Sequence, residues 1–186
     1  MTGYTKSTGT SGVTNLTDIQ IPLNESWYQD SVNSWTLYFE YYMPELTESL
    51  FTVANYRRHI CDIGSDSATR LLVYSVNVSG TSRICFVHNG VGVTTQTIAD
   101  TSVPIAEFNK VCKLALSWDG TNLLLGYNGQ VSNVPINEAL LSSTYDRIKI
   151  GQQTASTARG MNGKILKIDH FPKAFNSTEL VGVTTL

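Results

Sequence analysis

Glu40 is the carboxylate with the most suggestive neighbours in this sequence, because it lies among aromatic residues in the stretch 34–43. Glycoside hydrolysis normally requires two carboxylates that flank the scissile bond. The positions two and four residues beyond Glu40 are Tyr42 and Pro44, so this stretch places no second acid on the same face of a strand. We therefore expect no glycosidase activity, while a carboxylate pair formed across two separate strands stays open.

The aromatic residues around Glu40 suggest glycan binding instead. Alternate residues of a strand point to opposite faces, so Tyr38, Glu40 and Tyr42 are expected on one face and the residues between them in a core. Aromatic rings stack on the C–H faces of sugars, and a carboxylate accepts hydrogen bonds from their hydroxyls. With Trp27 and Tyr28 on a nearby loop, these five residues form a candidate ligand-binding site. The alternative interpretation is that the rings pack across neighbouring strands or against another subunit.

Signatures of other chemistry are weak. The sequence has no Gly-x-Ser-x-Gly elbow, no Walker loop and no Gly-x-Gly-x-x-Gly motif, and its histidines lie far apart. Asp62 and Asp66 on one turn, with Asp119 elsewhere, come nearest to a calcium site, but calcium takes roughly six to eight oxygen ligands. We expect no metal ion and no cofactor.

The cysteines Cys61, Cys85 and Cys112 each lie in an apolar or alternating stretch, and no Cys-x-x-Cys spacing occurs. An odd number of cysteines cannot all pair within one chain. We interpret them as small buried residues of strands, typical of a protein made in a reducing compartment.

Composition narrows the class of partner. The 186 residues suit one domain, and 41% hydrophobic residues exclude a disordered chain. The net charge of −2 argues against nucleic-acid binding, which needs a clustered basic surface. Uninterrupted apolar runs are too short to span a bilayer, and the first residues lack the apolar segment of a signal peptide.

The elements that would position these side chains are short strands, because apolar and β-branched residues alternate along most of the chain. Asp119-Gly120 and Asn128-Gly129 are typical of tight hairpin turns. A short helix is expected from Ser177. The expected strands span 16–21, 34–43, 50–54, 59–63, 69–78, 82–88, 91–98, 111–118, 123–127, 130–134, 147–150 and 163–170.

The most informative stretch for the fold is residues 113–130. Its sequence is Lys-Leu-Ala-Leu-Ser-Trp-Asp-Gly-Thr-Asn-Leu-Leu-Leu-Gly-Tyr-Asn-Gly-Gln. This stretch resembles the central hairpin of concanavalin A-like, laminin-G-like jelly rolls. Residues 147–151 look like the strand of that family that ends in glycine, and residues 160–180 look like its closing strand, proline bend and terminal helix. The resemblance covers about residues 34–186, and its ending is similar to versions found in bacteriophage virion proteins.

The resemblance implies an all-β fold, a two-sheet antiparallel jelly-roll sandwich. The core should include the alternating apolar residues of the hairpin, which are Leu114, Leu116, Trp118, Leu123, Leu125 and Tyr127. Enzymes of this fold that cut β-glucans carry a Glu-x-Asp-x-Glu strand, and the chain departs from that pattern after Glu40.

From these observations we expect a non-enzymatic bacteriophage virion surface protein, made in the host cytoplasm, whose lectin-like jelly roll binds host glycans. It would serve as a head decoration, head fibre or tail adhesin. A purely structural virion subunit is the alternative, and a glycan-degrading enzyme is a third.

The Ser/Thr/Gly-rich residues 1–12 form a candidate N-terminal docking arm ahead of a single domain over 13–186. Such a segment has too little apolar surface to fold alone, but its backbone can add a strand to a neighbouring chain. We expect the arm to bind other virion proteins or a sister subunit of a homo-oligomer.

Overall fold

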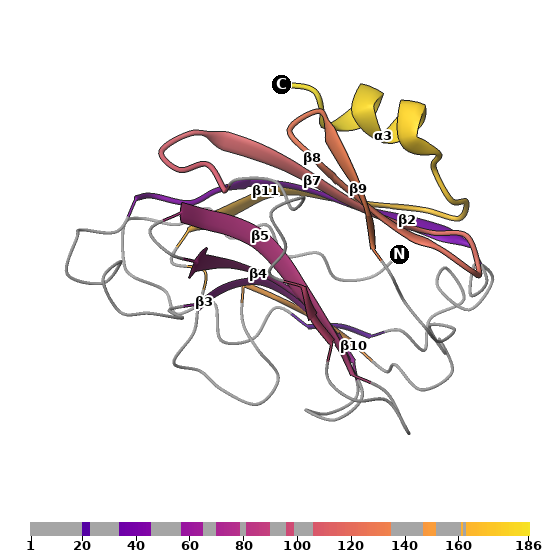
Figure 1. Cartoon of the computed structure of the whole chain (residues 1–186), viewed down its shortest axis with the longest axis horizontal. Helices are drawn as coiled ribbons and strands as arrows, with labels where there is room; N and C mark the ends of the chain where they lie inside the picture. Colours follow the sequence, from indigo (N-terminus) through magenta and orange to yellow (C-terminus); the bar gives the residue numbers. More distant parts are fainter. Residues whose placement is uncertain are drawn as a thin grey trace.

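The computed structural model describes residues 20–22, 34–45, 57–64, 70–78, 81–89, 96–98, 106–134, 147–151, 161 and 163–186. Strands dominate this part of the chain, with one helix at its end (Figure 1). The elements are β1 (Gln20–Pro22), β2 (Trp35–Tyr42), β3 (Arg57–Gly64), β4 (Arg70–Val78), β5 (Thr81–Asn89), β6 (Gln96–Ile98), β7 (Val111–Trp118), β8 (Leu123–Tyr127), β9 (Gln130–Val134), β10 (Arg147–Ile150), β11 (Lys164–Phe171) and α3 (Ser177–Thr184).

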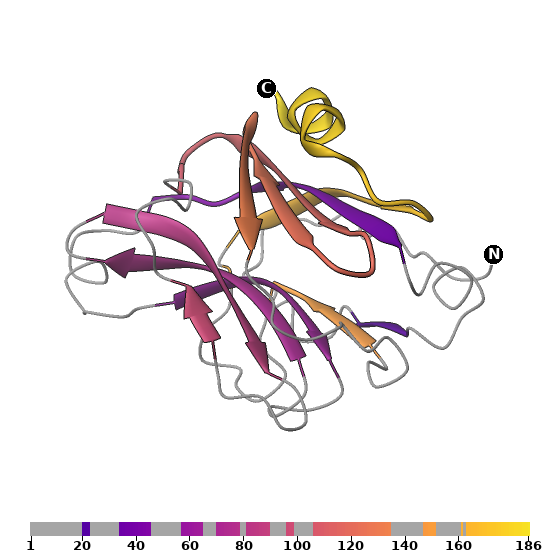
Figure 2. The same ribbon diagram turned by 45° about the vertical axis from the view of Figure 1, so that its right-hand side comes forward.

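The strands form two antiparallel sheets that stack face to face, as Figures 1 and 2 show. One sheet has the order β11-β2-β7-β8-β9, and we call it the helix-side sheet because α3 lies on its outer surface. The other, the opposite sheet, has the order β1-β10-β3-β4-β5-β6. This arrangement confirms the predicted two-sheet jelly-roll sandwich.

The core between the sheets confirms the predicted alternation. Along β2, the side chains of Trp35, Leu37, Phe39 and Tyr41 are at most 3% exposed and belong to the core cluster. The six core residues predicted for the β7–β8 hairpin are all buried there too. Burial of large apolar side chains is the main favourable term for such a fold.

Turn residues set the hairpins where the sequence predicts them. Gly120 takes a φ of 93° between β7 and β8, and Asn128 and Gly129 take positive φ values of 44° and 80° between β8 and β9. The Asp119 carboxylate accepts bonds from the backbone N–H groups of Thr121 and Asn122 at 2.8 and 2.6 Å. Asp119 therefore closes a turn, and these bonds lower its pKa.

The helix α3 begins as expected at Ser177. The Asn176 side chain accepts from the Glu179 backbone N–H at 3.0 Å, and the Glu179 carboxylate accepts from the Asn176 backbone N–H at 2.9 Å. This reciprocal pair is a capping box, which satisfies two amide donors at the start of the helix. None of the described helices is long and apolar enough to cross a membrane.

Two of the cysteines, Cys61 and Cys112, are buried and carry free thiols, as predicted. Cys85 lies in β5. The predicted strand at 50–54, the loop residues Trp27 and Tyr28, and the arm at 1–12 lie outside the described residues.

Candidate ligand-binding face

The outer surface of the helix-side sheet carries Tyr38, Glu40 and Tyr42, as the alternation along β2 predicts. Leu37, Phe39 and Tyr41, which alternate with them along β2, point into the core. The side chains of Tyr38, Glu40 and Tyr42 therefore point to the opposite, outer face. Strands β11 and β7 flank β2 and place one side chain on either side of each of these three residues. The register of the three strands therefore determines which groups a ligand on this surface would contact.

Four cross-strand rows make up this outer surface, each with one residue from β11, β2 and β7. From one end of the sheet to the other they are Lys164–Tyr42–Val111, Lys167–Glu40–Lys113, Asp169–Tyr38–Ala115 and Phe171–Thr36–Ser117. Directly opposite residues in antiparallel strands lie close enough for their side chains to interact.

The C-terminal segment covers the Tyr38 and Thr36 rows. Phe175 and Leu180 are buried against Tyr38 and Ala115 in a small apolar cluster outside the main core. Figure 2 shows α3 over the helix-side sheet, where it contacts β7, β8 and β9. The β2 and β7 residues of these two rows are therefore covered by the chain itself.

Tyr38 contributes to this face by positioning Glu40. Its side chain is only 5% exposed, and its hydroxyl donates to Glu40 Oε1 at 2.7 Å. Burial, and then the bond to Glu40, raise the pKa of Tyr38 above its usual value. The Lys167 ammonium lies 5.6 Å from the centre of the Tyr38 ring. The ring is thus packed within the protein, and its hydroxyl fixes one oxygen of Glu40.

The other two rows form the open part of the surface, which we call the polar half-face: Glu40, Tyr42, Val111, Lys113, Lys164 and Lys167. Glu40 and Tyr42 are partly exposed, Val111 is 40% exposed and Lys164 is exposed. This surface combines a partly exposed tyrosine, a carboxylate and three ammonium groups.

Two lysines of the polar half-face have partners at its borders. Lys167 Nζ lies 2.7 Å from Asp169 Oδ2, and this bond is the main reason that the pKa of Lys167 is raised. Lys113 Nζ donates to the Thr185 carbonyl at 2.8 Å, which links the half-face to the end of α3.

Asp169 is a candidate residue that the sequence did not reveal. The register places it on the strand next to Glu40, on the same surface, with Lys167 beside both. Glycoside hydrolysis requires two carboxylates that flank the scissile bond, and two acids on one surface meet the first condition for such a pair. The alternation within β11 predicts which face of the sheet Asp169 lies on. Its position near Glu40 depends on the pairing of β11 with β2, which local sequence patterns do not predict.

The acid and the histidine of β3 lie in the opposite sheet, away from this surface, and Asp66 lies outside the described residues. Asp62 is fully buried in β3, opposite Lys149 of β10 in the register. His59 is fully buried as well, with its ring edge-to-face against Tyr74 at 5.7 Å. Among the described residues, no three His, Cys, Asp or Glu side chains are grouped so that they could hold a metal ion.

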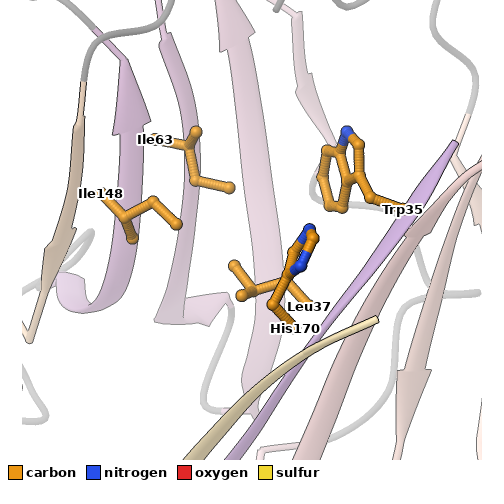
Figure 3. Close-up of a pocket in the computed structure, with 5 residues that line it drawn as sticks. All are labelled: Trp35, Leu37, Ile63, Ile148 and His170. Atoms are coloured by element: carbon orange, nitrogen blue, oxygen red, sulfur yellow. The ribbon is translucent and has the colours of Figure 1, made fainter. Parts of the chain in front are cut away.

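A small gap opens between the two sheets at the β11 side, lined by Trp35, Leu37, Ile63, Ile148 and His170 (Figure 3). Its free volume is about 10 Å³, roughly the room for one water molecule. Ligand pockets are usually of the order of several hundred Å³. The gap is therefore a packing feature, in which burial lowers the pKa of His170.

Comparisons with known proteins support the fold. No protein-family model matches the sequence, and no curated protein matches it. Among solved structures, a heptameric pentraxin from Limulus polyphemus is 12% identical, with a TM-score of 0.55 over 81% of this chain and 69% of its own.

Two further structures are similar in fold. Domain 4 of an extracellular arabinanase from Geobacillus stearothermophilus, solved with arabinotriose, is 11% identical, with a TM-score of 0.56 over 82% of this chain and 67% of its own. The enzymatically active domain of bacteriophage CBA120 tailspike protein 2 is 12% identical, with a TM-score of 0.59 over 82% of this chain. This chain spans only 24% of that tailspike chain. The sandwich is thus of a kind that occurs in a carbohydrate-complexed domain and in a phage tailspike.

Proposed function

We propose that this protein is a bacteriophage virion surface protein whose jelly roll binds host-surface glycans without cleaving them. The observation that carries the proposal is the partly exposed Tyr42 next to Glu40 on the polar half-face. Tyr42 offers a ring on which a sugar can stack, and Glu40 offers an acceptor for sugar hydroxyls.

The orientation of Glu40 strengthens this proposal. Because Tyr38 donates to Glu40 Oε1, one carboxylate oxygen is held and the other is left to accept from a ligand. Holding a binding group before the ligand arrives reduces the entropy lost on binding.

Two likenesses support the virion setting. The C-terminal stretch 160–180 resembles the endings of bacteriophage virion proteins, and the fold is similar to that of a phage tailspike domain. The arm at 1–12 would attach the domain to another virion protein or to a sister subunit, leaving the jelly roll outward.

A catalytic alternative rests on Glu40 and Asp169, which share one surface on neighbouring strands. Both are already engaged by donors of the protein, Glu40 by the Tyr38 hydroxyl and Asp169 by Lys167. A glycosidase acid has to deliver a proton to the leaving group, and an ion pair with lysine does not suit that role. We therefore favour binding over hydrolysis.

The test is binding of labelled protein to polysaccharides extracted from the bacterial host, compared between wild type and Tyr42→Ala. Loss of a central aromatic contact should weaken binding by about fivefold or more. Val181→Ala is the control, since Val181 is 40% exposed on α3 and is not one of the half-face residues. Equal binding by wild type and Tyr42→Ala would place the site elsewhere.

The same polysaccharides test for glycosidase activity, and labelling of intact particles tests for a position on the virion surface. We expect no new reducing ends from wild-type protein, whereas turnover that disappears in Glu40→Gln and Asp169→Asn would make the protein a glycosidase. Gold-labelled antibody should decorate the outside of intact particles. Decoration without any glycan binding would favour a purely structural virion subunit.

A further inference from the structure

We propose that the polar half-face is selective for anionic glycans, with Tyr42 as the stacking ring and Lys164 as the principal anion contact. This inference rests on the proposed glycan binding and specifies the chemical class of the ligand. It follows from the charge of the surface and from the strand register, which places the two residues directly opposite each other.

The charge of the half-face is positive. Three lysines (Lys113, Lys164 and Lys167) surround one carboxylate, Glu40, although the chain as a whole carries a net charge of −2. Including Asp169 at the border still leaves an excess of one positive charge. An overall acidic protein that gathers lysines around an accessible ring favours a negatively charged ligand there.

The lysines differ in how free they are to bind. Lys167 is paired with Asp169 at 2.7 Å, so its charge is largely balanced by its own neighbour. Lys113 uses one of its three donors on the Thr185 carbonyl and keeps two. Lys164 is exposed and has no ion pair with any residue that the structure describes.

Lys164 lies close enough to Tyr42 for both side chains to contact the same sugar. Side chains directly opposite in an antiparallel pair have Cβ atoms about 4.5–5.5 Å apart, so the Lys164 ammonium reaches the rim of a sugar stacked on Tyr42. Glu40 lies two residues along β2, where it can accept a hydroxyl from the same or the next sugar. A neutral sugar would use the ring and Glu40 but would leave Lys164 without a ligand group.

The carboxylate of a uronic acid and the phosphate of a teichoic acid share this chemistry, so the experiment uses both. The probes are polygalacturonate, the same polymer fully methyl-esterified, and poly(glycerol phosphate) teichoic acid. Methyl esterification removes the charge and keeps the sugar backbone. We expect at least one charged probe to bind more tightly than the ester, and its binding to weaken as salt is raised.

The variants are Lys164→Gln and, as a control with the same charge change, Lys173→Gln. Lys173 is exposed and pairs with Glu179 beside α3, away from the half-face. Lys164→Gln should weaken binding of the charged probe by about two- to fivefold, the usual effect of one exposed charge contact, and leave the ester unaffected. Lys173→Gln should bind as wild type does.

The possible failures are distinct. If the ester and the charged probes bind equally and Tyr42→Ala weakens both, glycan binding stands and anion selectivity is wrong. If Lys164→Gln and Lys173→Gln weaken the charged probe equally, the effect is general charge and the inference is wrong. If neither charged probe binds better than the ester, the inference fails whatever the host-polysaccharide assay gives.

Discussion

Ser117 in β7 bonds both polar groups of the Phe175 backbone. Its hydroxyl donates to the Phe175 carbonyl at 2.8 Å and accepts from the Phe175 N–H at 2.7 Å. Thr36 of the neighbouring strand supports the same segment, since its hydroxyl also accepts from the Phe175 N–H and donates to the Lys173 carbonyl at 2.9 Å. These buried bonds hold the chain against the sheet just before α3 begins.

Ser117→Ala should therefore lower the free energy of unfolding. The Phe175 carbonyl would lose its bond to Ser117 in a buried setting, and such a loss costs about 1–3 kcal/mol. Urea unfolding followed by circular dichroism measures the change. Ser177→Ala, an exposed serine in the first turn of α3, is the control and should change stability by less. Equal effects would contradict the importance of the Ser117 bonds.

Trp118→Ala tests the core that the sequence predicted. Trp118 is 2% exposed and lies in the core, opposite Trp35 and Leu123 in the register. Removing a large buried side chain leaves a cavity, and we expect a loss of about 3–5 kcal/mol in unfolding free energy. Leu166→Ala is the comparison, because Leu166 is 52% exposed and its truncation should be nearly neutral.

Much of the fold could be predicted because its signals are local. The predicted bounds of β7, β8, β9 and β10 match the structure, since alternation and turn residues such as Asn128 and Gly129 act over a few positions. The same alternation also predicted which side chains of β2 lie in the core and which lie on the outer surface.

The candidate site could be predicted only in part, for reasons of distance along the chain. Tyr38, Glu40 and Tyr42 share a face as expected, but the burial of Tyr38 depends on Phe175 and Leu180, far along the sequence. Lys164, Lys167 and Asp169 join the surface only because β11 pairs with β2. Local patterns do not specify which distant strands become neighbours.

Deleting residues 1–12 tests the proposed docking arm. The described core and both sheets are built from residues after this segment, so the shortened protein should fold with unchanged circular dichroism. We expect it to lose incorporation into particles or its oligomeric state, measured by particle co-sedimentation and by light scattering. Normal assembly of the shortened protein would show that attachment uses another surface.

The stability of the protein should depend on His170 below neutral pH. Burial in the apolar gap lowers the pKa of His170 below its usual 6.5, because the folded state disfavours the charged imidazolium. The unfolded chain then binds the proton more readily, so this contribution to stability is present above about pH 6.5 and is lost as the pH falls through the lowered pKa. His170→Phe should flatten this part of the pH profile in urea unfolding between about pH 8 and pH 5. An unchanged slope would show that other groups control it.

Two glycine substitutions test whether close packing against β8 holds α3 in place, one in β8 and a control in α3. Gly126 of β8 lies beneath α3, and a Cβ atom there would meet Thr184 Cγ2 at 3.2 Å and Leu180 Cβ at 3.4 Å. Gly126→Val adds still more volume, so it should push the helix off the sheet and lower the unfolding free energy by about 1–3 kcal/mol.

Amide hydrogen exchange should then be faster over 177–184, with the core strands less affected. Gly182→Ala is the control, since a Cβ atom at Gly182 meets nothing within 4 Å. Alanine in place of a helical glycine should instead stabilise the protein by about 0.5–1 kcal/mol. If Gly126→Val leaves exchange in α3 unchanged, then the helix does not depend on close approach to β8. Faster exchange in α3 for Gly126→Val, without such an increase for Gly182→Ala, would show that close contact with β8 holds the helix over the Tyr38 row and leaves the polar half-face as the open surface for the proposed ligand.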